Sequence, residues 1–290
     1  YFRLSGMCKD REALTRQSYE FDVVVVGSDM LWHPVNIEHD FYTLTFVPDT
    51  IKKVSYATSF GTTIIPPYQK ECARDFLNRF SFISVREQSG VEVVERLGVK
   101  KDIQVVLDPT LLFTADEWRI IQKEEPFIEG SYIFCYFLGV NQMHREIANR
   151  IKEKTGYKIA ALQHLDEYIP MDEGFGDIKP YNVGPGEFVN LIRHAAFVCT
   201  DSFHGTCFSI LNHRKFATFN RFIDGNSQST NTRIDSLLSI VGLENRRVTG
   251  SLSDKQLSDL IDREIDYDNV DYCLNSERKK SVEFLQKALF

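Results

Sequence analysis

Short motifs that identify several common enzyme classes are missing from this sequence of 290 residues. It contains no GxxxxGK(S/T) phosphate loop, no GxSxG nucleophile motif and no HExxH zinc motif. The glycine pairs at 174–176 and 184–186 lack the third glycine and the preceding strand of a dinucleotide fingerprint. The sequence therefore gives no indication of a P-loop nucleotidase, an α/β-hydrolase, a zinc peptidase or a dinucleotide-dependent oxidoreductase.

Paired cysteines and long apolar runs are missing as well. The six cysteines are scattered without a CxxC pair, so we expect small buried side chains in a reducing compartment, with no disulfide framework and no metal site. No secretory signal and no apolar run of membrane-spanning length is found in the sequence. We therefore expect a cytoplasmic protein that is not an integral membrane protein. Because the chain begins at Tyr1, we also expect a further segment upstream of it.

The charge balance leaves no excess of cations. Lys and Arg number 34 against 41 Asp and Glu, which gives a formal net charge of -7. A broad nucleic-acid-binding face needs clustered cations, so we expect no nucleic-acid partner. A small anionic substrate needs only a few converging cations and stays compatible with this composition. With 43% hydrophobic residues, the chain has the composition of an ordinary globular protein.

Short apolar runs alternate with segments of helical period, which is typical of parallel βα units. We expect strands at 21–26, 53–59, 80–85, 103–107, 131–138, 157–162, 196–200 and 215–219. We expect helices at 68–80, 89–97, 144–154, 187–194 and 205–212, and one from a capping box at Ser253 to about Ile265. The pattern predicts an α/β fold.

A charged, turn-like stretch at 122–130 separates the two sets of βα units. We therefore expect two Rossmann-like domains, 1–125 and 126–270, since 290 residues exceed what a single core usually serves. A C-terminal segment, 271–290, contains a helix expected at 275–289 that crosses back to the first domain.

The strongest candidate for a site is Asp201-Ser202-Phe203-His204-Gly205, where a buried strand turns into a helix. Ligands of open parallel sheets bind beyond the carboxyl ends of the strands. Backbone N–H groups near Gly205 and Thr206 would suit a phosphate or carboxylate, and His204 could donate a proton near neutral pH. The alternative is that Asp201 and Ser202 only cap the helix and that His204 packs between domains.

Other candidates follow the strands of the first half. Arg86 suits bidentate recognition of a carboxylate or phosphate, or else forms a structural pair with Glu87 or Asp108. Ser59 follows the second expected strand.

Asp29 and Trp32 follow the first expected strand. Asp29 could accept a substrate hydroxyl and Trp32 could stack on a sugar ring, with a capping Asp and a core Trp as the alternatives. Asp266-Tyr267-Asp268 has the DxD form of a metal-binding motif, but it follows a helix, so we expect a solvated linker there.

Five segments occur in an order and spacing that resembles the polysaccharide pyruvyl transferase family. They are Val24 to Trp32, Val54 to Gly61, Ile83 to Glu87, Val106 to Thr110 and Thr200 to Thr206. The resemblance implies two Rossmann-like domains in a glycosyltransferase-B-like arrangement, with the active site between them. It also implies transfer of a pyruvyl group from phosphoenolpyruvate to two hydroxyls of a saccharide, which forms a cyclic ketal and releases phosphate.

The resemblance carries over to particular residues. His204 matches the catalytic histidine of the family and Arg86 matches an arginine associated with phosphoenolpyruvate. Some members have an arginine where this chain has Ser202 and a lysine where it has Asp224. The anion site would then be completed by Lys215, Arg221 or Arg233, or else the donor or the reaction has changed.

The resulting hypothesis is an enzyme of cell-surface polysaccharide (exopolysaccharide) biosynthesis. His204 would act as general acid and Asp29 is the candidate base. The expected partners are phosphoenolpyruvate, as donor substrate rather than cofactor, and a saccharide or lipid-linked saccharide acceptor. Two alternatives remain open: a glycosyltransferase with a nucleotide-sugar donor, and a non-catalytic saccharide-binding protein.

Overall fold

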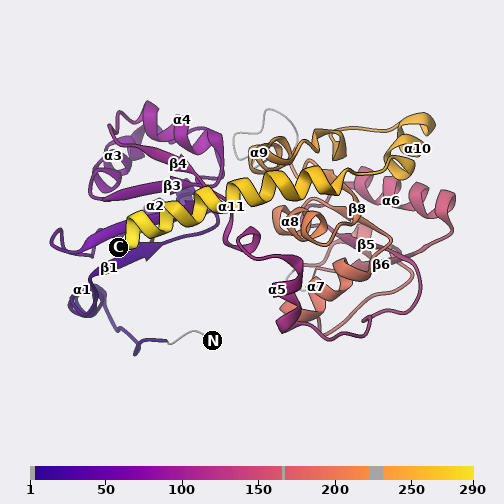
Figure 1. Ribbon diagram of the computed structural model, residues 1–290, viewed down its shortest axis with the longest axis horizontal. Coiled ribbons are helices and arrows are strands. Elements are labelled where there is room, and N and C mark those ends of the chain that lie inside the picture. Colours follow the sequence, from indigo (N-terminus) through magenta and orange to yellow (C-terminus); the bar gives the residue numbers. More distant parts are fainter. Residues whose placement is uncertain (1–3, 165–166, 223–230) are drawn as a thin grey trace. The chain divides into compact units, whose positions relative to one another are not determined.

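The computed structural model describes residues 4–164, 167–222 and 231–290. The chain forms two compact units (Figure 1). Unit 1 comprises Tyr1–Pro109 together with Glu277–Phe290, and unit 2 comprises Thr110–Ser276. The last helix, α11 (Tyr267–Leu289), therefore contributes residues to both units.

Unit 1 is built on a sheet of four parallel strands in the order β1-β2-β3-β4. The strands are β1 (Val23–Val26), β2 (Lys52–Thr58), β3 (Phe82–Val85) and β4 (Ile103–Val105). The helices of this unit that precede α11 are α1 (Arg11–Ser18), α2 (Pro34–Glu38), α3 (Lys70–Asn78) and α4 (Gln88–Arg96). All four strands run in one direction, so their carboxyl ends lie at the same edge of the sheet.

Helices cover both faces of this sheet. Helices α3 and α4 contribute Phe76 and Val94 to a core cluster that also contains Ile83 of β3. On the other face, the ring of Phe284 in α11 lies 6.4 Å from the rings of both Tyr56 and Phe82. Apolar side chains on both faces of each strand require this double cover, which is the usual arrangement of parallel sheets.

Unit 2 contains a second parallel sheet, in the order β6-β5-β7-β8-β9. Its strands are β5 (Tyr132–Tyr136), β6 (Lys158–Leu162), β7 (Phe197–Thr200), β8 (Lys215–Phe219) and β9 (Arg247–Val248). Its helices are α5 (Ala115–Trp118), α6 (Gln142–Thr155), α7 (Pro185–His194), α8 (Phe203–Leu211), α9 (Thr232–Val241) and α10 (Asp254–Asp262). The strand order reverses direction at β5, so unit 2 has the topology of an open, doubly wound sheet.

Both faces of the second sheet are also covered. Helices α6 and α10 supply Ile147 and Leu257 to a core cluster that includes Cys135 and Cys199 of the strands. On the other face, Phe188 of α7 packs edge-to-face on rings of β5 and of α8. Cys135, Cys199 and Cys207 are buried free thiols, as expected from the sequence. For the other three cysteines the expectation of burial was wrong, because Cys8 and Cys273 are partly exposed and Cys72 is exposed.

The strands and helices expected from the sequence are present, with ends that differ by a few residues. Helix α6 ends at Gly156 with a left-handed φ of 72°, and α10 begins with the expected capping box at Ser253. Helices α1 and α2 and strand β9 were not expected, because they are short or lack a clear apolar period. Helix α9 was not expected either, although its buried apolar residues 234, 237, 238 and 241 have helical spacing. The expectation for Asp266 to Asp268 was wrong, because α11 begins at Tyr267 and Asp266 Oδ1 accepts a hydrogen bond from Asn269 N.

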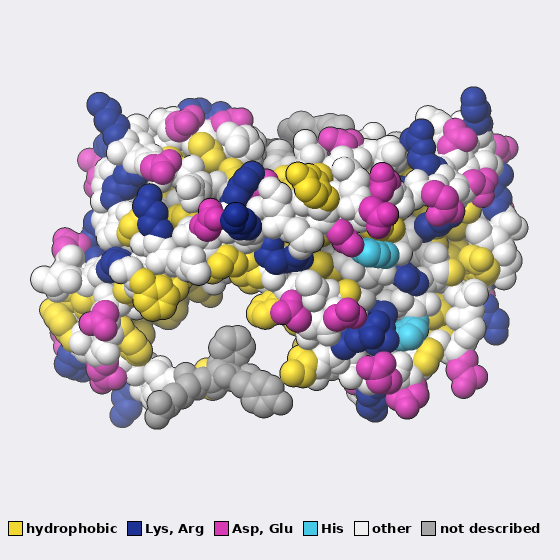
Figure 2. All heavy atoms as spheres, in the orientation of Figure 1, with side chains coloured by type: hydrophobic (Ala, Val, Ile, Leu, Met, Phe, Trp, Pro, Cys, Tyr) yellow, Lys and Arg dark blue, Asp and Glu magenta, His cyan; other side chains and the backbone are white. Residues whose placement is uncertain are grey.

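On the face shown in Figure 2, Lys and Arg side chains alternate with Asp and Glu and form no continuous basic field. Within the part of the chain that the structure describes, no helix combines the length and the apolar character needed to cross a bilayer.

Candidate functional site

Residues that follow the four strands of unit 1 converge at the carboxyl edge of its sheet. Arg86, after β3, donates from Nη1 to Asp108 Oδ2 at 2.6 Å and from Nη2 to Asp29 Oδ1 at 2.9 Å. Its Nε lies 4.0 Å from Glu87 Oε2. Ser28 Oγ donates to the same Asp108 oxygen at 3.1 Å. The sequence-based expectation that these residues meet at one edge is correct.

Arg86 is an internal partner of carboxylates in this arrangement. Its side chain is 1% exposed, and those of Glu87 and Asp108 are 1% and 2% exposed. Burial alone would lower the pKa of Arg86, but Asp108, Glu87 and Asp29 outweigh it and raise the pKa. One buried guanidinium thus faces three carboxyl groups of the protein itself, and both of its Nη atoms already donate to two of them. This is the structural pairing that the sequence analysis held as the alternative for Arg86.

Asp29 is the accessible member of this cluster, with a side chain that is 53% exposed. Its backbone is left-handed, with φ of 63°. Its carbonyl oxygen accepts from Ser59 N at 2.8 Å, and its Oδ1 accepts from Met30 N at 2.9 Å. Hydrogen bonds to backbone and to Arg86 therefore fix a half-exposed carboxylate at the edge of the sheet.

Two other sequence candidates in unit 1 are internal. Ser59 is fully buried and donates from Oγ to Glu87 Oε1 at 2.7 Å, so its hydroxyl serves the cluster and not a ligand. Trp32 is also fully buried, its ring centroid lies 5.4 to 5.6 Å from those of Phe60, Phe76 and Phe80, and its Nε1 donates to Tyr42 O at 3.1 Å. The expectation that Trp32 stacks on a sugar was therefore wrong.

In unit 2, helix α8 begins shortly after β7, and the amides of Gly205 and Thr206 in its first turn are already hydrogen-bonded. Ser202 is the N-cap, and its Oγ accepts from Gly205 N at 3.2 Å. The amide of Thr206 donates to Ser202 O at 3.0 Å. The expectation that the amides of Gly205 and Thr206 would bind an anion was wrong, and the predicted capping role of Ser202 is confirmed.

Gly205 and Thr206 instead pack α8 against the sheet. A Cβ at Gly205 would lie 2.5 Å from Thr200 Oγ1, so only glycine permits this approach of the helix to β7. The buried Thr206 hydroxyl donates to Ser202 O and lies 2.9 Å from the Thr218 hydroxyl of β8. The start of α8 is thus held rigidly between β7 and β8, which fixes the backbone that carries His204.

His204 occupies the first turn of α8 and is partly exposed. Its ring lies 5.5 Å from that of Phe203 in an edge-on contact. The guanidinium of Arg233, from α9, lies over the same Phe203 ring, 5.9 Å from its centroid. A cation and an imidazole therefore flank the same aromatic side chain at the start of α8.

A second cation follows β8, the strand next to β7. Arg221 is partly exposed, and its guanidinium lies 5.5 Å from the ring of Phe222. Among the residues that the structure describes, no carboxylate forms an ion pair with Arg221. Its backbone and side-chain stem adjoin Gly139, which in turn adjoins Asp201. Arg221 and Arg233 are thus both placed by contacts to the 201–204 segment or its immediate neighbours.

The remaining cation proposed from the sequence is placed elsewhere. Lys215 is the first residue of β8, at the opposite end of that strand from Arg221, and pairs with Glu264 at 2.6 Å. The expectation that Lys215 completes an anion site was therefore wrong. Asp224, the other departure from the family pattern, lies outside the described residues.

A buried polar network at this edge was missed by sequence reasoning. Asp201 does not cap α8; its carboxylate accepts from Leu138 N at 2.6 Å and Gly139 N at 2.9 Å. Behind that turn, Arg145 donates to Asp172 Oδ1 at 2.8 Å, and His164 Nδ1 lies 2.8 Å from Asp172 Oδ2. Burial alone would raise the pKa of Asp172, but His164 and Arg145 outweigh it and lower the pKa. Because the members are far apart in sequence, no short motif could have indicated them.

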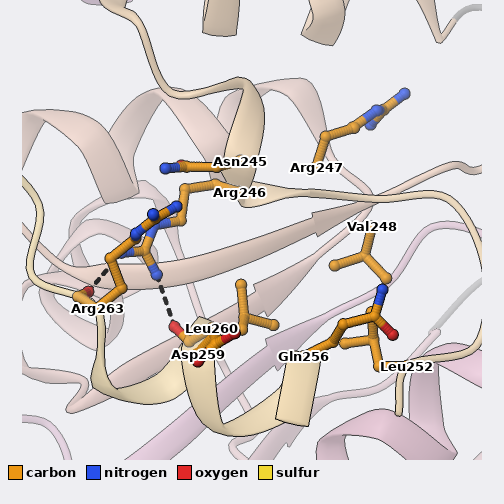
Figure 3. A pocket seen from close by; sticks show the side chains of 9 residues that line it. All are labelled: Asn245, Arg246, Arg247, Val248, Leu252, Gln256, Asp259, Leu260 and Arg263. Atoms are coloured by element: carbon orange, nitrogen blue, oxygen red, sulfur yellow. Dashed lines mark hydrogen bonds between the residues drawn. The ribbon is translucent and has the colours of Figure 1, made fainter.

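A separate pocket of about 210 Å³ is lined by three arginines but by none of the candidate residues (Figure 3). Arg246 is buried and donates to the carbonyl oxygens of Leu260 and Arg263, so it caps the end of α10. Arg247 points away from these side chains and pairs with Asp235 at 2.9 Å. The pocket is therefore formed by structural arginines. Across the described ranges, no three His, Cys, Asp or Glu residues group as metal ligands.

With one parallel sheet in each of its two units, the chain is a two-unit α/β protein with Rossmann-like sheets. Comparison with known families identifies the family. The sequence profile described as "Polysaccharide pyruvyl transferase" matches residues 3–221. The chain therefore belongs to the polysaccharide pyruvyl transferase family, a family of transferases, and the resemblance found in the sequence is confirmed. No match was found among proteins with curated descriptions.

Solved structures share the fold at low sequence identity. The UDP-GlcNAc 2-epimerase of Neisseria meningitidis is 13% identical with a TM-score of 0.53, over 96% of this chain and 80% of that one. A putative UDP-N-acetylglucosamine 2-epimerase of Listeria monocytogenes is 13% identical with a TM-score of 0.54, over 94% and 80%. The glycosyltransferase SnogD of Streptomyces nogalater is 12% identical with a TM-score of 0.46, over 95% of this chain and 75% of that one. The likeness to the two epimerases, with TM-scores above 0.5, confirms the expected fold class of two Rossmann-like units.

Proposed function

We propose that this protein transfers the pyruvyl group of phosphoenolpyruvate to two hydroxyls of a saccharide and releases inorganic phosphate. Membership of the pyruvyl transferase family supports the reaction class. The observation that carries the proposal is the start of α8, where Arg233 lies over the Phe203 ring beside His204 and where Arg221 follows the neighbouring strand β8. An acid and two cations on neighbouring segments suit a donor that carries both a phosphate and a carboxylate.

In the proposed reaction, His204 delivers a proton to the methylene carbon of the donor. The first acceptor oxygen forms a bond to the adjacent carbon, which also holds the phosphate ester. The phosphate then leaves with its bridging oxygen, and the second acceptor oxygen takes its place to close the ketal. Of the two protons lost by the acceptor hydroxyls, one restores His204 and the other leaves with the phosphate, so the reaction is balanced.

The cations of unit 2 would hold the donor. Arg221 has no carboxylate partner among the described residues, and it follows β8, next to the strand that leads into α8. Adjacent strands lie about 4.8 Å apart, so a single phosphate could contact groups from both connections. A positioned general acid contributes roughly 10²- to 10⁴-fold to the rate, and electrostatic stabilisation of the transferred anion is expected to contribute more.

The carboxylate cluster of unit 1 suits a different role. Arg86 is 1% exposed and both of its Nη atoms donate to carboxylates, so an anion has no access to its guanidinium in this arrangement. We therefore assign Arg86 to positioning Asp29, whose half-exposed carboxylate could accept a hydrogen bond from an acceptor hydroxyl. This assignment replaces the phosphoenolpyruvate contact that the family resemblance implies for Arg86. The acceptor, a saccharide or lipid-linked saccharide, and a role in surface polysaccharide biosynthesis belong to the same proposal.

The test is thermal melting with millimolar phosphoenolpyruvate, and separately with UDP, on wild type and on His204→Ala, Arg221→Ala and Arg74→Ala. Arg74 is exposed and lies in unit 1, so its removal matches the charge change of Arg221→Ala. A ligand that binds only the native state raises the melting temperature. We expect a shift with phosphoenolpyruvate that persists in His204→Ala and Arg74→Ala and is lost in Arg221→Ala. A shift with UDP alone would contradict the proposal and favour a nucleotide-sugar donor, while a shift with neither would favour a saccharide-binding protein.

A further inference from the structure

The turn that follows β5 lies against two of the segments that form the proposed donor site. It contains Leu138 and Gly139, between β5 and the N-cap of α6 at Asn141. Both amides of this turn donate to the carboxylate of Asp201, at 2.6 Å and 2.9 Å. Asp201 has a side chain with 0% exposure. Two amide donors therefore hold a fully buried carboxylate directly before the helix that carries His204.

Arg145 holds the same turn from the opposite side. Its Nη1 donates to Gly139 O at 3.4 Å and to Asn141 O at 3.2 Å. Its guanidinium lies 5.5 Å from the ring of Phe137. Its pairing with Asp172 completes the restraint. The turn is thus bound through its amides to Asp201 and through its carbonyls to a buried arginine, which leaves it little freedom to move.

The space over Gly139 is filled by Arg221. A Cβ at position 139 would lie 2.9 Å from Asp201 Oδ2, 3.3 Å from Arg221 Cγ and 3.5 Å from Arg221 O. The stem of Arg221 therefore rests on the bare backbone of Gly139, beside the carboxylate that fixes the turn. Any side chain at position 139 needs one of these neighbours to move.

We propose that Gly139 and Asp201 are positioning residues for Arg221: they form a rigid floor under the stem of its side chain and so fix where its guanidinium lies. The inference rests on the proposed function for the ligand that Arg221 binds, but the contact itself does not. Asp201 is buried and doubly bonded, whereas Arg221 is partly exposed and carries no ion pair within the described ranges. A Cβ at position 139 would meet both Asp201 Oδ2 and Arg221 Cγ, so the arginine stem shifts together with the carboxylate that supports it.

The variant that tests this is Gly139→Ala, which displaces Arg221 without removing its charge. The matched control is Gly250→Ala, in the same unit, where a Cβ meets nothing within 4 Å. We expect Gly139→Ala to weaken binding of phosphoenolpyruvate by about tenfold or more, since a hydrogen bond between charged groups is weakened or lost when the guanidinium is displaced. In an Arg221→Ala background, Gly139→Ala should add no further loss of binding, because it acts through the side chain already removed. Equal losses in both backgrounds would overturn the inference.

A double-mutant cycle in thermal stability needs no ligand and separates this inference from the proposed function. Melting temperatures are measured for wild type, Gly139→Ala, Arg221→Ala and the double variant. We expect the drop caused by Gly139→Ala to be smaller in the Arg221→Ala background, because removal of Cγ relieves the 3.3 Å contact. Additive drops would overturn the inference. If wild type fails to bind phosphoenolpyruvate while the stability cycle shows coupling, the proposed donor is wrong and the positioning of Arg221 stands.

Discussion

Replacement of Arg86 separates the role that the structure gives this arginine from the role that the family resemblance implies. The side chain is 1% exposed and donates to Asp108 at 2.6 Å and to Asp29 at 2.9 Å. Arg86→Ala leaves the 2% exposed carboxylate of Asp108 without this cation. Loss of one partner from a buried ion pair destabilises a protein by about 3–5 kcal/mol. Asp29 is half-exposed and can be hydrated, so most of the expected loss arises at Asp108 and at Glu87, which is 1% exposed.

The assay is urea unfolding followed through a tryptophan in unit 1. The chain has two tryptophans, and a Trp118→Phe background leaves Trp32, which is fully buried in the core of unit 1. In this background we expect Arg86→Ala to lower the free energy of unfolding by about 3–5 kcal/mol. The double variant Arg86→Met with Asp108→Asn should recover part of the loss, since it also removes the buried charge. Arg74→Ala, at an exposed site, should stay within about 0.5 kcal/mol of the parent.

The opposite outcome would refute this reasoning. If Arg86→Ala unfolds within about 0.5 kcal/mol of the parent and only weakens binding of phosphoenolpyruvate, Arg86 binds the donor directly. The carboxylate cluster would then rearrange when the ligand enters, and the assignment of Arg86 to positioning Asp29 would be wrong.

Three further predictions follow from single contacts. Gly205→Ala places a Cβ 2.5 Å from Thr200 Oγ1 and should destabilise unit 2 by about 1–3 kcal/mol in urea unfolding, and a neutral result would show that α8 can shift away from β7. Thr206→Val removes the hydroxyl that bonds to Ser202 O and contacts Thr218. Calorimetry should show a loss of about 1–3 kcal/mol in the free energy of unfolding, whereas an unchanged free energy would contradict the buried network. The lowered pKa of Asp172 contributes stability that is complete above about pH 4 and is lost as pH falls through the folded value. The difference in unfolding free energy between wild type and Asp172→Asn should therefore shrink as the pH falls below about 4, and a gap that widens there would reverse the sign.

The fold was predictable because its signals are local. Apolar runs such as Val23–Val26 alternate with helical periods, and the capping box at Ser253 and the left-handed Gly156 mark helix ends in the sequence itself. Strand β9 spans only Arg247–Val248, too short for any pattern, and forms because β8 offers it a partner. The early start of α11 at Tyr267 was missed because Asp266 caps it in a stretch that reads as polar linker.

The site was predictable only in part, because exposure and pairing depend on the tertiary structure. The sequence indicated correctly which residues follow the strands, and these do gather at one edge of the sheet. It could not indicate that Trp32 and Ser59 are fully buried, or that Arg86 already has carboxylate partners. A residue type that suits a ligand equally suits an internal pair, and the number of neighbours within reach decides between them.

Isothermal titration of phosphoenolpyruvate into wild type and Arg221→Ala tests the central claim most directly. A hydrogen-bonded charge pair contributes about 1.5–3 kcal/mol, which corresponds to a roughly 10- to 150-fold change in affinity. We predict that wild type and Arg74→Ala bind phosphoenolpyruvate alike and that Arg221→Ala binds it weaker by that factor. Equal affinity in Arg221→Ala and wild type, or the absence of binding by the folded wild-type protein, would contradict the proposed donor site at the start of α8.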